Sequence, residues 1–225
     1  MIDLSTNRGG RTVGRCHQPL TRLRAATILA ALMMTLPMPA SAHLVSTRFG
    51  SFYSGLLHPL TAFQHLLPWL ALALLGVMAG GRGVRFGFSL FPLAVLGGVL
   101  AGTIWPLPET LMRETDLLNV GSFVLFGGLA ALYVRLPAWL FAMLCVLFGF
   151  SHGLANADAS LHGNARWLYV GGVTLAAYVL FALAAAGAAG VRDRLDFGGI
   201  ALRVAGSWVA AIGLVLGAFE LVRAT

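Results

Sequence analysis

The fold is decided most clearly by residues 167–190, which read WLYVGGVTLAAYVLFALAAAGAAG and contain no charged side chain. A helix over this run would rise about 36 Å, at about 1.5 Å per residue. That length is enough to cross the hydrocarbon core of a bilayer, which is roughly 30 Å thick. The run therefore predicts a transmembrane helix.

Five further apolar runs occupy residues 58–80, 84–105, 117–134, 137–155 and 198–222. Each is close to the length of about 17 to 25 residues that a spanning helix needs. The whole chain is 58% hydrophobic and only 10% charged, whereas a soluble domain carries about 25% charged residues. We therefore predict an all-α polytopic membrane bundle of about six transmembrane helices.

Glycine pairs at four-residue spacing recur along these runs, for example Gly98 with Gly102 and Gly213 with Gly217. Such pairs let helix backbones approach closely. The pattern fits close packing within one bundle, and it also leaves open a homo-oligomer.

Residues 1–42 have the features of a cleavable signal peptide. Arginine-rich residues 1–24 precede a short apolar run, 25–36, and the chain then reaches Ala40-Ser41-Ala42, a typical A-x-A cleavage site. A run of about 12 apolar residues is too short to span a bilayer. We expect cleavage after Ala42, which leaves residues 43–225 as one six-helix domain in the bacterial inner membrane with a periplasmic N-terminus.

The basic charge agrees with this orientation. The chain carries a formal net charge of +7, and all its Lys and Arg residues are arginine. The loops expected on the cytoplasmic side contain Arg82, Arg85, Arg135, Arg192 and Arg194. Positive residues favour cytoplasmic loops, and no basic patch alternates with aromatic residues as a single-strand binding groove requires. We therefore expect the bilayer as a partner and no nucleic acid.

The first polar cluster lies in residues 55–67, GLLHPLTAFQHLL. Pro59 suits the first position of a helix, which would put His58 at the N-terminal boundary. His65 follows on the same face, about 10 Å further along an undistorted helix. The two imidazoles could be successive stations on an entry path, or a break near Pro59 could bring them to one ion. Gln64 adds an amide oxygen.

The second cluster lies in residues 148–158, FGFSHGLANAD, at the end of the fourth predicted helix. His152 and Asn156 are four residues apart and share a helix face. Gly153 would let a neighbouring helix approach closely. Asp158 follows, and the partial negative charge of a helix C-terminus favours a cation there.

The predicted topology places both clusters at the periplasmic end of the bundle. Ionisable groups at membrane depth are costly and usually functional. Imidazole together with carboxylate or amide oxygen suits Ni²⁺, Co²⁺ or Zn²⁺. We therefore predict a metal site, with structural polar packing as the alternative, drawn from His58, Gln64, His65, His152, Asn156 and Asp158. We expect no tightly bound cofactor.

At these residues the sequence resembles the HupE/UreJ family of hydrogenase- and urease-associated nickel transporters. That family has a signal peptide, six membrane helices, a His-x5-Asp-His motif in the first helix and a His-Gly-x-Ala-His-Gly-x-Glu motif in a later one. His58 and His65 match the first motif, with Gln64 at the Asp position.

The second motif is matched at its first His, Gly and Ala by His152, Gly153 and Ala155. Asn156 stands at the position of the second His, and Ala159 stands at that of the Glu. The resemblance therefore covers both clusters, with substitutions in each.

The resemblance implies a secondary transporter that captures a divalent metal, nickel or cobalt, at the periplasmic face, and it implies no enzyme activity. Two alternatives use the same residues. One is a non-transporting membrane accessory or sensor protein for metalloenzyme assembly. The other is a haem-binding membrane protein with axial histidines from two helices.

Overall fold

The computed structural model describes residues 42–223, and every regular element in that part of the chain is an α-helix. The helices are α2 (Ala42–Thr61), α3 (Phe63–Met78), α4 (Gly80–Ile104), α5 (Glu109–Ala131), α6 (Ala138–Ala155), α7 (Gly163–Arg194) and α8 (Gly198–Arg223). The predicted all-α fold is confirmed. Residues 1–41 of the predicted signal peptide lie outside the described residues.

Several of these helices are long and apolar enough to cross a membrane. Among the described residues, α4, α6, α7 and the Gly198–Glu220 part of α8 meet that test singly. Gly50–Thr61 and Phe63–Met78 meet it together as a bent pair, which gives up to five spans. The chain is thus a multi-pass membrane protein.

The third predicted segment corresponds to α5, which does not meet the same test, so length and hydropathy support fewer spans than the six expected. The first two turns of α5 contain Glu109, Arg113, Glu114 and Asp116. Further along, α5 carries the buried polar side chains of Asn119 and Ser122. These groups lower the hydropathy of α5.

The helix expected over residues 58–80 is broken: the chain bends by 72° between α2 and α3, close to the break near Pro59 that the sequence left open. Ala62 is extended (φ −93°, ψ 98°), and its carbonyl accepts the first hydrogen bonds of α3, from the backbone N–H groups of His65 (2.9 Å) and Leu66 (3.1 Å). His58 therefore lies in the last turn of α2, not at the start of a helix, and Pro59 lies inside α2.

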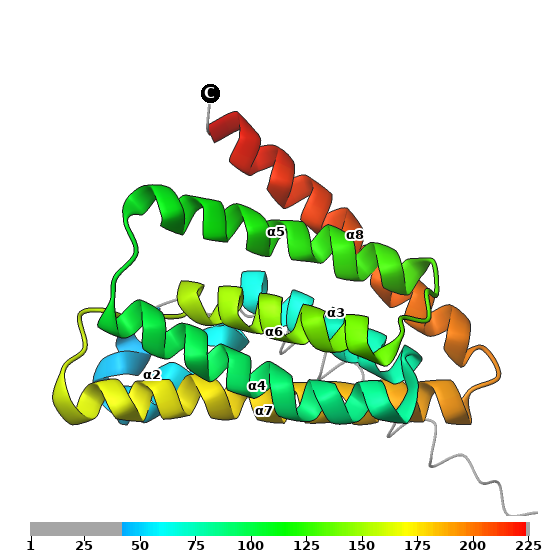
Figure 1. Cartoon of the computed structure of the whole chain (residues 1–225), viewed down its shortest axis with the longest axis horizontal. Helices are drawn as coiled ribbons and strands as arrows, with labels where there is room; N and C mark the ends of the chain where they lie inside the picture. The colour runs from blue at the N-terminus through cyan, green and yellow to red at the C-terminus, as the bar shows by residue number, and fades with distance from the viewer. Residues whose placement is uncertain (1–41, 224–225) are drawn as a thin grey trace, which may run out of the picture. The chain divides into compact units, whose positions relative to one another are not determined.

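Helices pack in pairs, α4 with α6, α5 with α8 and α2 with α7 (Figure 1). Glycine makes the α4–α6 approach possible. A Cβ atom added to Gly98 would lie 2.9 Å from the Cα of Gly153, and one added to Gly153 would lie 2.9 Å from the backbone N of Val99. At both positions a side chain would meet backbone atoms of the other helix, so the close approach expected at Gly153 is confirmed.

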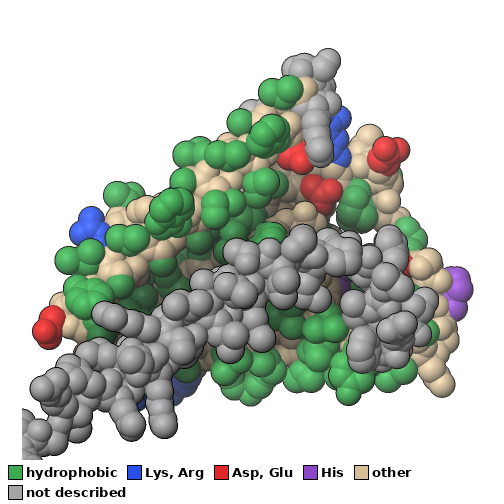
Figure 2. All heavy atoms as spheres, turned by 180° about the vertical axis from the view of Figure 1, so that it is seen from behind, with side chains coloured by type: hydrophobic (Ala, Val, Ile, Leu, Met, Phe, Trp, Pro, Cys, Tyr) green, Lys and Arg blue, Asp and Glu red, His purple; other side chains and the backbone are tan. Residues whose placement is uncertain are grey.

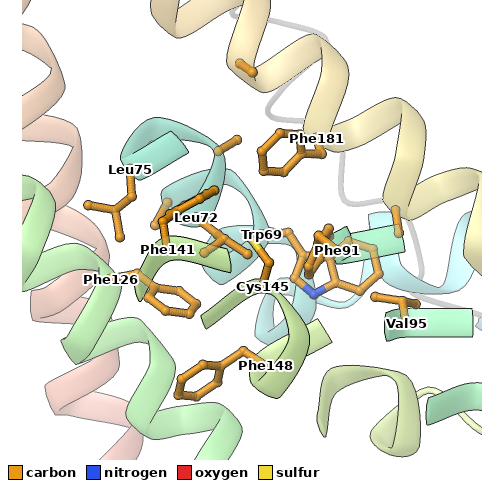
Figure 3. Close-up of a cluster of buried hydrophobic side chains, with 14 of the residues drawn as sticks. Trp69, Leu72, Leu75, Phe91, Val95, Phe126, Phe141, Cys145, Phe148 and Phe181 are labelled. Carbon is orange, nitrogen blue, oxygen red and sulfur yellow. The ribbon is translucent and has the colours of Figure 1, made fainter. Parts of the chain in front are cut away.

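The centre of the bundle is filled by large apolar side chains around α3 (Figure 3). Trp69 packs edge-to-face on Phe91 with ring centroids 5.3 Å apart. The outer surface is also apolar: Figure 2 shows hydrophobic side chains over much of one face, and Leu183, Trp208 and Phe219 are among the exposed large residues. This distribution suits a protein surrounded by lipid chains.

Candidate metal site

Two buried histidines from distant parts of the chain meet in the bundle. The Nδ1 atoms of His65 on α3 and His152 on α6 lie 3.1 Å apart, and the side chains are 2% and 0% exposed. Trp69, one turn after His65, places its ring 6.2 Å from the ring of His152. The two clusters that the sequence placed at one end of the bundle are therefore in direct contact.

The bend at Ala62 brings a third histidine close. The ring centroids of His58 and His65 are 6.0 Å apart, and His58 also lies 6.5 Å from the ring of Tyr169 on α7. The His58 side chain is exposed whereas His65 is buried. Two imidazoles that bind one ion through bonds of about 2.1 Å have ring centroids no more than about 6.4 Å apart, so one ion could contact both.

α5 supplies two polar partners that the sequence analysis did not include. The Oγ of Ser122 lies 3.2 Å from Nε2 of His152 and donates to the carbonyl of Asn119 at 2.5 Å. The Oγ of Ser151, beside His152, donates to Oδ1 of Asn119 at 2.7 Å. Asn119 and Ser122 are three residues apart in an otherwise apolar run, a signal that could have identified a polar helix face.

Asn156 closes the C-terminus of α6. The side-chain Nδ2 of Asn156 donates to the backbone carbonyl of His152 at 2.7 Å. The backbone carbonyl of Asn156 accepts a hydrogen bond from the hydroxyl of Tyr169 at 3.0 Å. The shared face expected for His152 and Asn156 is therefore used for a helix cap. The side-chain Oδ1 of Asn156 stays unused and is buried.

The other two predicted ligands lie further out. Gln64 is exposed, although its neighbour His65 is buried. Asp158 accepts hydrogen bonds from the backbone N–H (3.0 Å) and the hydroxyl (2.6 Å) of Ser160 in the loop before α7.

Three buried polar atoms at this site have no hydrogen-bond partner: Nε2 of His65, Nε1 of Trp69 and Oδ1 of Asn156. Unpaired buried polar groups are rare because each costs about 1 to 3 kcal/mol. In the described part of the chain, no three His, Cys, Asp or Glu side chains gather closely enough to hold a metal ion by themselves. A cation here would need mixed ligands, with amide oxygen beside imidazole.

Comparison with known proteins identifies the family of the chain. The model of the family described as HupE / UreJ protein matches residues 30–216. The chain is 32% identical over 200 residues to Protein HupE of Rhizobium leguminosarum bv. viciae, an alignment that covers 86% of this chain and 96% of that protein. No solved structure matches.

Proposed function

The chain belongs to the HupE/UreJ family, and from this premise we propose that it is a secondary transporter of a divalent transition metal, nickel or cobalt. The ion would be captured at the periplasmic face of the bacterial inner membrane and carried inward. The site would be formed by His58, His65, His152 and Asn156, with Asp158 and Gln64 near the entrance.

One observation carries the proposal: a buried imidazole with an unpaired ring nitrogen lies next to an exposed imidazole. His58 is exposed at the surface of the protein, and its ring centroid lies 6.0 Å from that of the buried His65. An ion could first bind His58 and then pass to His65 without losing imidazole coordination. Such graded burial suits a path that must both accept an ion and release it.

The chemistry of the site favours a borderline metal. Imidazole nitrogen and amide oxygen suit Ni²⁺ and Co²⁺, whereas Cu(I) prefers thiolate or thioether sulfur. Cys145, the cysteine among the described residues, is buried among apolar side chains on α6. The haem alternative gains no support, because a direct contact of 3.1 Å between His65 and His152 leaves no room for iron between them.

The proposal is tested by the accumulation of radioactive nickel and cobalt in cells that express the chain. His58→Ala and His152→Ala should each lower accumulation at least tenfold at matched membrane abundance. His162→Ala is the control, because His162 is exposed just before α7 and its ring contacts Arg166 in the first turn of that helix (3.3 Å). Undiminished accumulation in both site variants would contradict the proposal. Metal binding without accumulation would favour the accessory or sensor alternative.

A further inference from the structure

The hydrogen bonds around His152 fix which nitrogen of each buried imidazole carries a proton. The hydroxyl of Ser122 has one proton, and its oxygen lies 2.5 Å from the carbonyl oxygen of Asn119. Two oxygens at that distance require a proton between them, so Ser122 donates to Asn119. Towards His152 the same hydroxyl can then act only as an acceptor.

The direction of the next two bonds follows. Nε2 of His152 lies 3.2 Å from the Ser122 oxygen and must donate its proton to it. In a neutral imidazole the other nitrogen is then a bare acceptor. Nδ1 of His152 therefore accepts from Nδ1 of His65 at 3.1 Å, and His65 carries its proton on Nδ1.

The end of this chain of hydrogen bonds is the unpaired atom of the site. With a proton on Nδ1, the Nε2 of His65 is a bare lone pair, and it is the His65 nitrogen that has no partner in the bundle. Metal-binding histidines generally donate their second ring N–H to a fixed acceptor, which orients the ring and makes the ligating nitrogen more basic. His152 occupies the position of that acceptor.

We infer that His65 binds the transported metal through Nε2, and that His152 is a positioning residue whose Nδ1 holds His65 in the ligating tautomer. Ser122 sets the tautomer of His152 in turn. This inference rests on the proposed function, which supplies the identity of the transported metal. It divides the two histidine clusters by role: α2 and α3 supply imidazole ligands, whereas α5 and α6 supply the support.

The tautomers can be read without any metal. In the detergent-solubilised chain with ¹⁵N-labelled histidine, NMR should show one buried imidazole protonated on Nδ1 and another protonated on Nε2. His65→Asn should remove the signals of the ring protonated on Nδ1. Ser122→Ala should shift the signals of the ring protonated on Nε2. A His152 ring protonated on Nδ1 would overturn the inference, even if the protein transports nickel.

Metal affinity separates a ligand from a positioning residue. When Asn replaces a histidine, its amide oxygen can occupy the position of Nδ1. When Gln replaces a histidine, its amide lies near the position of Nε2. We expect His152→Gln to weaken Ni²⁺ binding by about 10- to 100-fold and His152→Asn to recover most of that loss. His65→Asn, which keeps the Nδ1 position and loses Nε2, should abolish binding.

Equal losses in His152→Asn and His65→Asn would overturn the inference, because His152 would then behave as a ligand. The two proposals fail in different ways. If the parent chain accumulates nickel but the tautomers are reversed, only the division of roles is wrong. If the tautomers and affinities are as expected but no nickel crosses the membrane, only transport is wrong.

Discussion

At the scale of single residues, the polar network behind His152 combines groups that are costly to leave unpaired. Ser151 donates to Oδ1 of Asn119 at 2.7 Å, and both side chains are buried. Asn119→Leu should destabilise the protein by about 1 to 3 kcal/mol, because it leaves the Ser151 hydroxyl without an acceptor. Thermal unfolding in detergent measures this loss.

A double variant provides the control. Ser151→Ala combined with Asn119→Leu removes both partners, so the pair should cost clearly less than the sum of the single changes. Additive losses would show that the Asn119–Ser151 hydrogen bond does not link α5 to α6.

The sequence predicted the histidines of this site but not their polar partners. His58, His65 and His152 stand out because ionisable groups are rare in apolar runs. Asn119 and Ser122 are uncharged, and only the packing of α5 against α6 shows that Ser122 contacts His152 and that Asn119 contacts Ser151 beside it. Gln64 is next to His65 in sequence and stands at the Asp position of the motif, yet it is exposed, because neighbouring helix residues point in different directions.

At the scale of helices, adjacent glycines on α4 offer a matched test of close packing. A Cβ atom added to Gly98 would meet the backbone of α6, with Leu154 N at 2.8 Å. A Cβ added to Gly97 would meet only the ring of Phe150 at 3.7 Å, an ordinary contact. Gly98→Ala should therefore lower stability by about 1 to 3 kcal/mol, whereas Gly97→Ala should be nearly neutral.

Thermal unfolding of the two variants in the same detergent decides the point. Equal stability of Gly97→Ala and Gly98→Ala would contradict the close approach of α4 and α6.

Hydrophobic runs predicted most helices closely. The expected segment 137–155 corresponds to α6 (Ala138–Ala155), and 84–105 corresponds to α4 (Gly80–Ile104). The sequence offered a break near Pro59 only as one of two alternatives and did not locate the bend at Ala62, because the apolar pattern continues through it. The bend accompanies tertiary packing: Gly55 on α2 lies against the backbone of Tyr169 on α7, a contact that the sequence does not indicate.

At the scale of the whole protein, the apolar outer surface and the buried polar site fit a membrane protein whose function lies inside the bundle. In the part of α8 that is long and apolar enough to cross a membrane, only 17% is buried within the protein. Polar side chains such as His65, Ser122 and His152 instead face the interior. In lipid, such groups are retained where they bind one another or a substrate.

The central claim is that this chain alone moves a divalent metal through the His65 site. Purified protein reconstituted into vesicles would show this most directly, with uptake of radioactive nickel measured for the parent and for His65→Asn. If the His65 site carries the metal, the parent should show saturable uptake, and the variant should show uptake at the level of protein-free vesicles. Uptake by the parent that matches protein-free vesicles, or that is unchanged by His65→Asn, would contradict this claim.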